Sequence, residues 1–87
     1  MTSYLLTYDL FRPGQNYPAL ITALTNAGAV RILQSTWVLR SQGTSANVRD
    51  HFVQYMDAND SIFVCELNSN WAAFWKVNSD SALRVLP

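Results

Sequence analysis

The sequence has few charged residues and no excess of either sign. Only 14% of its 87 residues are charged, and six basic side chains balance six acidic ones; an ordinary globular domain has roughly 25%. Proteins that hold a phosphate backbone along its length carry a basic excess. The composition therefore argues against non-specific binding of nucleic acid, although it leaves room for a local patch.

Cysteine and long apolar runs are also scarce. Cys65 is the only cysteine, which excludes an intrachain disulfide or a zinc site built from cysteines. No run approaches the ~18 apolar residues of a membrane span. The N-terminus lacks the basic and apolar regions of a secretory signal. We therefore expect a cytoplasmic protein with no membrane association.

Common catalytic signatures are missing. There is no phosphate-binding glycine loop, dinucleotide fingerprint or zinc spacing. The only histidine, His51, is a candidate general base, but at its position we interpret it as a residue on the surface of a helix. Ser35 and Thr36 have no glycine-framed nucleophile motif and no base near them in sequence.

Apolar residues, in contrast, are abundant. They make up 49% of the chain, which is more than a domain of this length readily hides in its own core. We expect one domain over residues 1–87, with a core at about 3–68 and a tail at 69–87. Part of the apolar excess is expected in a homodimer interface; a monomer with an apolar surface is the alternative.

Hydrophobic periodicity predicts the elements of the first half. Residues 3–10 alternate as a strand. A helix over 17–27 follows and ends at Gly28, which suits a left-handed C-terminal stop. Residues 29–41 are rich in β-formers but too long for one typical strand, so we expect two short strands with a bend near 34–35.

The second half predicts one more helix and one more strand. Thr44 or Ser45 is the expected N-cap of the helix, whose apolar positions recur at helical spacing up to Met56. The segment SIFVCEL (61–67) is the expected last strand. One face of the sheet is expected to bury the core, and the other to suit dimer contacts and to carry Leu5, Val38, Ile62 and Val64.

Strand, helix, strand pair, helix and strand make up an α+β pattern. This βαββαβ order predicts a ferredoxin-like sandwich, an antiparallel sheet with both helices on one face. An irregular aromatic tail follows, in which Trp71, Phe74 and Trp75 would line one side of a helical turn. We expect the tail to pack over the core or onto a partner subunit; a lid or ligand-stacking surface is the alternative.

Several of these segments resemble a known group. A strand ending in Tyr8-Asp9, a helix ending in glycine and the segment LQSTWVL (33–39) are similar to the CRISPR-associated Cas-two family. Its SinR-like relatives are closer, because their Glu-Leu-x-x-Asn-Trp-Ala segment matches residues 66–72. The VapD-type ribonuclease toxins share the architecture. The resemblance covers about residues 4–73.

The resemblance implies a ferredoxin-like homodimer in which Asp9 of each subunit faces a shared cleft. Paired carboxylates there would hold a divalent cation, Mg²⁺ or Mn²⁺. Some members of the group are metal-dependent nucleases, for which RNA or DNA is the expected partner, and others are adaptors for a protein partner. Two features depart from the group: the basic excess is missing, and the aromatic tail does not match the usual C-terminal strand.

The candidate site residues are Asp9, Arg12 and Asp60. The first and last strands of a ferredoxin-like sheet are antiparallel neighbours, so Asp60 should approach Asp9. Asp9 with Asp60, or two Asp9 residues across a dimer axis, are the candidate metal ligands. Asp9 and Arg12 are the candidate catalytic pair, because phosphoryl transfer needs charge stabilisation beside the metal. All three are also ordinary turn or surface residues.

The leading hypothesis is therefore a CRISPR-associated-endoribonuclease-like dimer, either a metal-dependent ribonuclease with Asp9 as the metal-facing carboxylate or another nucleic-acid-related module. One alternative is a non-catalytic dimerisation or adaptor protein. Another is a small-ligand binder at the dimer cleft, with Trp71 or Trp75 stacking on the ligand.

Overall fold

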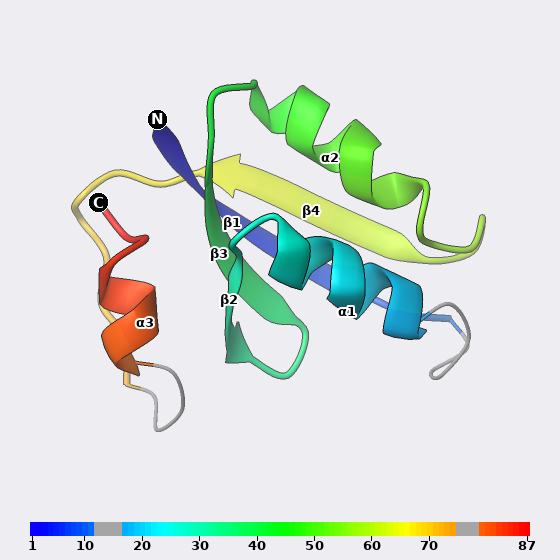
Figure 1. Ribbon diagram of the computed structural model, residues 1–87, viewed down its shortest axis with the longest axis horizontal. Helices are drawn as coiled ribbons and strands as arrows, with labels where there is room; N and C mark the ends of the chain where they lie inside the picture. The colour runs from blue at the N-terminus through cyan, green and yellow to red at the C-terminus, as the bar shows by residue number, and fades with distance from the viewer. Residues whose placement is uncertain (12–16, 75–78) are drawn as a thin grey trace.

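Four strands form one antiparallel sheet in the order β2-β3-β1-β4 (Figure 1). The computed structural model describes residues 1–11, 17–74 and 79–87. In chain order its elements are β1 (Thr2–Asp9), α1 (Tyr17–Asn26), β2 (Val30–Leu33), β3 (Thr36–Ser41), α2 (Ser45–Val53), β4 (Ser61–Glu66) and α3 (Ser79–Leu83). The predicted α+β class, with helices and an antiparallel sheet, is confirmed.

Local sequence sets the ends of these elements. Gly28 follows α1 with φ +79°, a left-handed conformation that glycine adopts without steric cost. The two-residue turn between β2 and β3 falls at 34–35, where the bend was predicted. Asn16, a residue type that suits the N-cap of a helix beginning at 17, lies outside the described residues.

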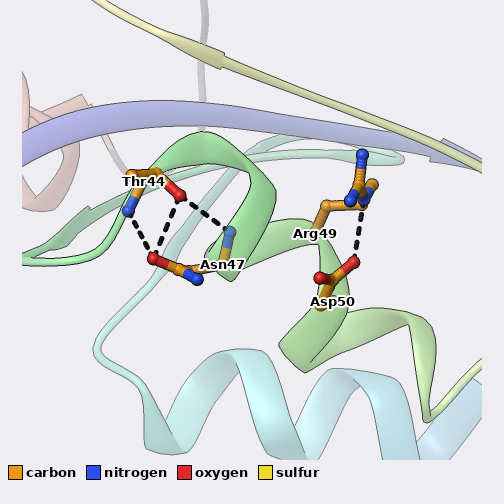
Figure 2. A network of polar contacts seen from close by, with 4 residues as sticks. All are labelled: Thr44, Asn47, Arg49 and Asp50. Atoms are coloured by element: carbon orange, nitrogen blue, oxygen red, sulfur yellow. Dashed lines mark hydrogen bonds and ion pairs between the residues drawn. The ribbon is translucent and has the colours of Figure 1, made fainter.

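A capping box begins α2, as Figure 2 shows. The Thr44 side chain accepts a hydrogen bond from the Asn47 backbone N–H at 3.1 Å, and Asn47 Oδ1 accepts one from the Thr44 backbone N–H at 2.9 Å. This reciprocal pairing satisfies backbone donors that an isolated helix start leaves unpaired. Farther along α2, Arg49 Nε and Asp50 Oδ1 form an exposed ion pair at 2.9 Å.

The main core lies between the sheet and the helices α1 and α2. Leu6 of β1, Leu24 of α1 and Phe52 of α2 are 0%, 0% and 2% exposed. Residues of both helices and of the two central strands share this cluster, so the two helices cover the same face of the sheet. The buried members are Tyr4, Leu6, Tyr8, Leu20, Leu24, Trp37, Leu39, Val48 and Phe52.

The C-terminal segment covers the opposite face at the β2–β3 side. Val38 of β3 is fully buried there in a second cluster that includes Ala82 of α3. The Val85 carbonyl oxygen accepts hydrogen bonds from Ser3 Oγ at 2.6 Å and Arg40 Nε at 3.1 Å. Figure 1 shows α3 beside β2, away from α2. The tail is thus attached to the sheet by both apolar packing and hydrogen bonds.

The tail differs in detail from its prediction. Residues 71–74 have no regular structure, and the helix lies later, at α3. Trp71 packs against the second cluster, and its Nε1 donates to the Pro87 carbonyl oxygen at 3.1 Å. Phe74 is 91% exposed, and Trp75 lies outside the described residues. Ala82 and Leu86, which follow the polar stretch 78–81, supply the buried apolar contacts of the tail.

The prediction for the faces of β4 was wrong. Ile62 and Val64 pack against the main core under the helices, rather than on the other face with Leu5 and Val38. The pairing register is the reason: Ile62 lies opposite Tyr8, and Val64 lies opposite Leu6. Residues directly opposite each other in an antiparallel pair point to the same face, and shifting the register by one residue reverses every side chain.

Candidate functional site

The β1–β4 side of the open face is where the candidate carboxylates lie. The second cluster, in which the C-terminal segment packs, covers this face on its β2–β3 side. On the β1–β4 side, Phe63 is 62% exposed and Asp9 is also exposed. By strand alternation and register, six side chains share what we call the β1–β4 face. They are Leu5, Thr7, Asp9, Ser61, Phe63 and Cys65.

A hollow of about 240 Å³ opens at one end of this face. It is bounded by residues 7–9 of β1 and 61–63 of β4. The two stretches are paired directly, with Thr7 opposite Phe63 and Asp9 opposite Ser61. Asp9 thus brings a carboxylate to the hollow, and the other five lining residues are Thr7, Tyr8, Ser61, Ile62 and Phe63.

Asp9 is the last residue of β1 and is exposed at the edge of this hollow. Within the described part of the chain its carboxylate makes no hydrogen bond and no ion pair. An ionised carboxylate offers two acceptor oxygens and no donor. Asp9 is thus available to a cation or to a ligand with N–H or O–H groups.

Asp60 comes to the same end of the sheet but is already occupied. Its Oδ1 accepts a hydrogen bond from the Phe11 backbone N–H, and its Oδ2 accepts one from the Asp57 backbone N–H, both at 2.7 Å. The side chain thereby ties the segment after β1 to the turn before β4. Hydrogen bonds from backbone N–H groups to a carboxylate are among the stronger ones, so we assign Asp60 a structural role at the site.

Two threonine hydroxyl groups beside the hollow, those of Thr7 and Thr36, are hydrogen-bonded within the sheet. Thr7 Oγ1 donates to the Ser35 carbonyl oxygen at 3.1 Å and lies 2.9 Å from Thr36 Oγ1. Because Thr7 has one hydroxyl proton, Thr36 is the donor when Thr7 donates to Ser35. These residues therefore hold the β1–β3 pair together beside the site and form no activated nucleophile.

Neither His51 nor Trp71 is brought to Asp9. His51 lies on α2, where it makes an edge contact with the Phe52 ring at a centroid distance of 4.8 Å; α2 packs on the face opposite Asp9. Trp71 packs with the tail. Arg12, the proposed catalytic partner of Asp9, lies outside the described residues, as does Trp75.

One subunit supplies few metal ligands. Among residues 1–11, 17–74 and 79–87, no group of three or more His, Cys, Asp and Glu lies together. Mg²⁺ commonly takes only one or two carboxylates and completes its octahedron with water and phosphate oxygens. The chemistry of Asp9 therefore suits such a cation, most readily with a second carboxylate from another copy.

Phe63 is the residue of this face that the sequence analysis did not single out. The signal was its place between Ile62 and Val64, since one of the two alternating sets of β4 must turn outward.

No helix in the described ranges is both long and apolar enough to cross a membrane. No model of a known protein family matches the sequence.

Proposed function

We propose that the protein is a CRISPR-associated-endoribonuclease-like homodimer of ferredoxin-like domains, acting as a metal-dependent ribonuclease with Asp9 as the metal-facing carboxylate. One observation carries the proposal: Asp9 is exposed at the edge of a hollow, without a hydrogen-bonding or ionic partner in the described residues. The other nearby carboxylate, Asp60, holds two backbone N–H groups.

The strand order supports the ferredoxin-like part of the proposal. A β2-β3-β1-β4 sheet with α1 and α2 on one face has the arrangement expected of the split βαβ class. In such a domain the end of β1 and the start of β4 are neighbours, which agrees with the pairing of Asp9 and Ser61.

A dimer would complete the ligand set. A two-fold axis passing beside Asp9 would bring the Asp9 carboxylates of both subunits to one cation. No additional strand or helix would be needed to supply the second carboxylate. A divalent cation held there supplies charge stabilisation to phosphoryl oxygens and lowers the pKa of a bound water. The role of Asp9 is to bind and orient; the Asp60 carboxylate keeps the surrounding loops in place.

The test is cleavage of single-stranded RNA with Mg²⁺ or Mn²⁺ by wild type, Asp9→Asn and Asp50→Asn. Asp50 is an exposed aspartate on α2, so it is the matched control. We expect Asp9→Asn to lose on the order of 100-fold or more, the scale for removing an electrostatic stabiliser, and Asp50→Asn to keep the activity. Wild-type rates in Asp9→Asn, or no cleavage by the wild type with either metal, would contradict the proposal.

A second candidate, the non-catalytic adaptor, is favoured by the apolar character of the same face. Phe63 is largely exposed beside half-buried Leu5 and Cys65, and the chain has no net charge. A stable dimer that cleaves no RNA with either metal would support it. The hollow is smaller than the ~300–1,000 Å³ pockets that enclose drug-sized ligands, which makes the small-ligand hypothesis the weakest of the three.

A further inference from the structure

An exposed aromatic ring lies next to the candidate carboxylate. Phe63 is 62% exposed although it is in the middle of β4, and its neighbours Ile62 and Val64 turn inward to the main core. The ring lines the same hollow as Asp9. Single exposed apolar residues are ordinary on protein surfaces, but this one coincides with a hollow and an available carboxylate.

The register gives the ring and the carboxylate a useful spacing. Phe63 lies opposite Thr7, and Asp9 lies opposite Ser61, so Phe63 and Asp9 are diagonal neighbours on one face. Such neighbours lie roughly 7–8 Å apart. A planar group stacked on the Phe63 ring would extend over Thr7, and its substituents would reach the Asp9 side of the hollow.

We propose that Phe63 is a stacking platform for one unpaired base of a single-stranded nucleic acid. The proposal rests on the proposed function for the identity of the ligand, while the stacking contact itself requires no cation. Exposed aromatic side chains commonly bind unpaired bases in this way, and every base has a face to offer. A duplex hides those faces within its own stack, so the ring selects unpaired substrate.

The charge distribution agrees with stacking as the main source of affinity. The chain has equal numbers of basic and acidic residues, so its net charge supplies no general attraction to a phosphate backbone. The hollow beside the ring is about 240 Å³. That volume suits one base and is too small for a folded RNA element.

The experiment measures binding in EDTA, so that it is independent of catalysis. Fluorescence anisotropy of a labelled single-stranded RNA, UUAUU, is followed with wild type and with Phe63→Ala, Phe63→Leu and Phe63→Trp. Phe74→Ala is the matched control, because Phe74 is 91% exposed in the tail. Stacking on one aromatic predicts a loss of about 5- to 150-fold for Ala and Leu, with Trp and the control near wild type.

Competition and light-scattering measurements distinguish an unpaired base from the other possible occupants of the Phe63 site, which are a duplex, a free nucleotide and a second copy of the chain. Unlabelled UUAUU is expected to compete, while a blunt-ended, G·C-rich RNA duplex that stays fully paired and free adenosine monophosphate compete poorly. Equal competition by the duplex, tighter binding of the free nucleotide, wild-type binding by Phe63→Ala or no binding by the wild type would each overturn the proposal. So would a change from dimer to monomer in Phe63→Ala by light scattering, because the ring would then belong to an interface between copies.

The two proposals fail separately. Binding that depends on Phe63 without cleavage in Mg²⁺ or Mn²⁺ would leave the stacking site standing and contradict the ribonuclease. Cleavage that depends on Asp9 and is unchanged in Phe63→Ala would contradict the stacking site alone.

Discussion

Replacing Asp60 with alanine tests the structural role assigned to that carboxylate. The change removes the acceptor of two backbone N–H groups, from Phe11 and Asp57, each at 2.7 Å. Hydrogen bonds to a charged group contribute about 1.5–3 kcal/mol each when well shielded. The hydrogen bond to Phe11 is exposed and Asp60 is half-buried. Water can therefore bond to the N–H groups that the substitution leaves free, which offsets part of the lost stability. We therefore expect Asp60→Ala to lower the free energy of unfolding by about 2 kcal/mol.

That loss is large for a chain of this length. At about 0.05–0.15 kcal/mol per residue, 87 residues give a total stability of roughly 4–13 kcal/mol. Urea unfolding followed by tryptophan fluorescence measures the change. With a denaturant slope of about 2 kcal/mol/M, the midpoint should fall by about 1 M.

The control is Asp50→Ala on α2. Asp50 pairs with Arg49, and the two side chains are 67% and 53% exposed, so breaking this ion pair should cost less than about 0.5 kcal/mol. Asp60→Asn should fall between the two, because its amide keeps one acceptor oxygen and turns a donor toward the second N–H. If Asp60→Ala unfolds at the same urea concentration as Asp50→Ala, the structural role of Asp60 is refuted.

Three further substitutions are checked by the same urea titration. Gly28→Ala should cost about 1 kcal/mol, because φ is +79° there with open space around the added Cβ; an unchanged midpoint would contradict the left-handed stop. Thr44→Ala should cost about 1 kcal/mol by breaking the capping box with Asn47, and a neutral result would count against the cap. Leu6→Ala should cost about 2–5 kcal/mol because Leu6 is 0% exposed. Leu33→Ala, at a position 57% exposed, should cost far less, and similar losses at both would contradict the assignment of the core.

Much of the fold was predictable because it follows from local patterns. The alternation predicted for residues 3–10 puts Tyr4, Leu6 and Tyr8 on the face opposite to Leu5, and all three are buried. Gly28 marked the end of α1, and Thr44 was one of the two expected caps of α2. Each of these features depends on residues within a few positions of each other, so neighbouring sequence carries the information.

Features that depend on long-range pairing were harder to predict. The facing of Ile62 and Val64 is decided by their register with β1, and the alternating run in β4 has apolar residues on both faces. The tail was similarly ambiguous: three aromatics at 71–75 suggested a helical turn, whereas α3 forms at 79–83 and packs through Ala82 and later residues.

The candidate site was predictable in position and only partly in chemistry. Antiparallel neighbours in the expected sheet bring Asp60 to the end of β1, and its hydrogen bond with Phe11 shows that it lies there. Sequence alone did not reveal that both Asp60 oxygens accept backbone hydrogen bonds, nor that Phe63 turns outward beside Asp9. These depend on loop geometry and strand register, which composition does not specify.

Calorimetric titration of Mg²⁺ and Mn²⁺ into wild type, Asp9→Asn and Asp50→Asn, with the oligomeric state checked by light scattering, tests the proposed role of Asp9 most directly. We predict a dimeric wild type that binds a divalent cation, an Asp9→Asn dimer that does not, and an Asp50→Asn dimer that binds as the wild type does. Binding that survives in Asp9→Asn, or no binding by the dimeric wild type, would contradict the assignment of Asp9 as a metal ligand.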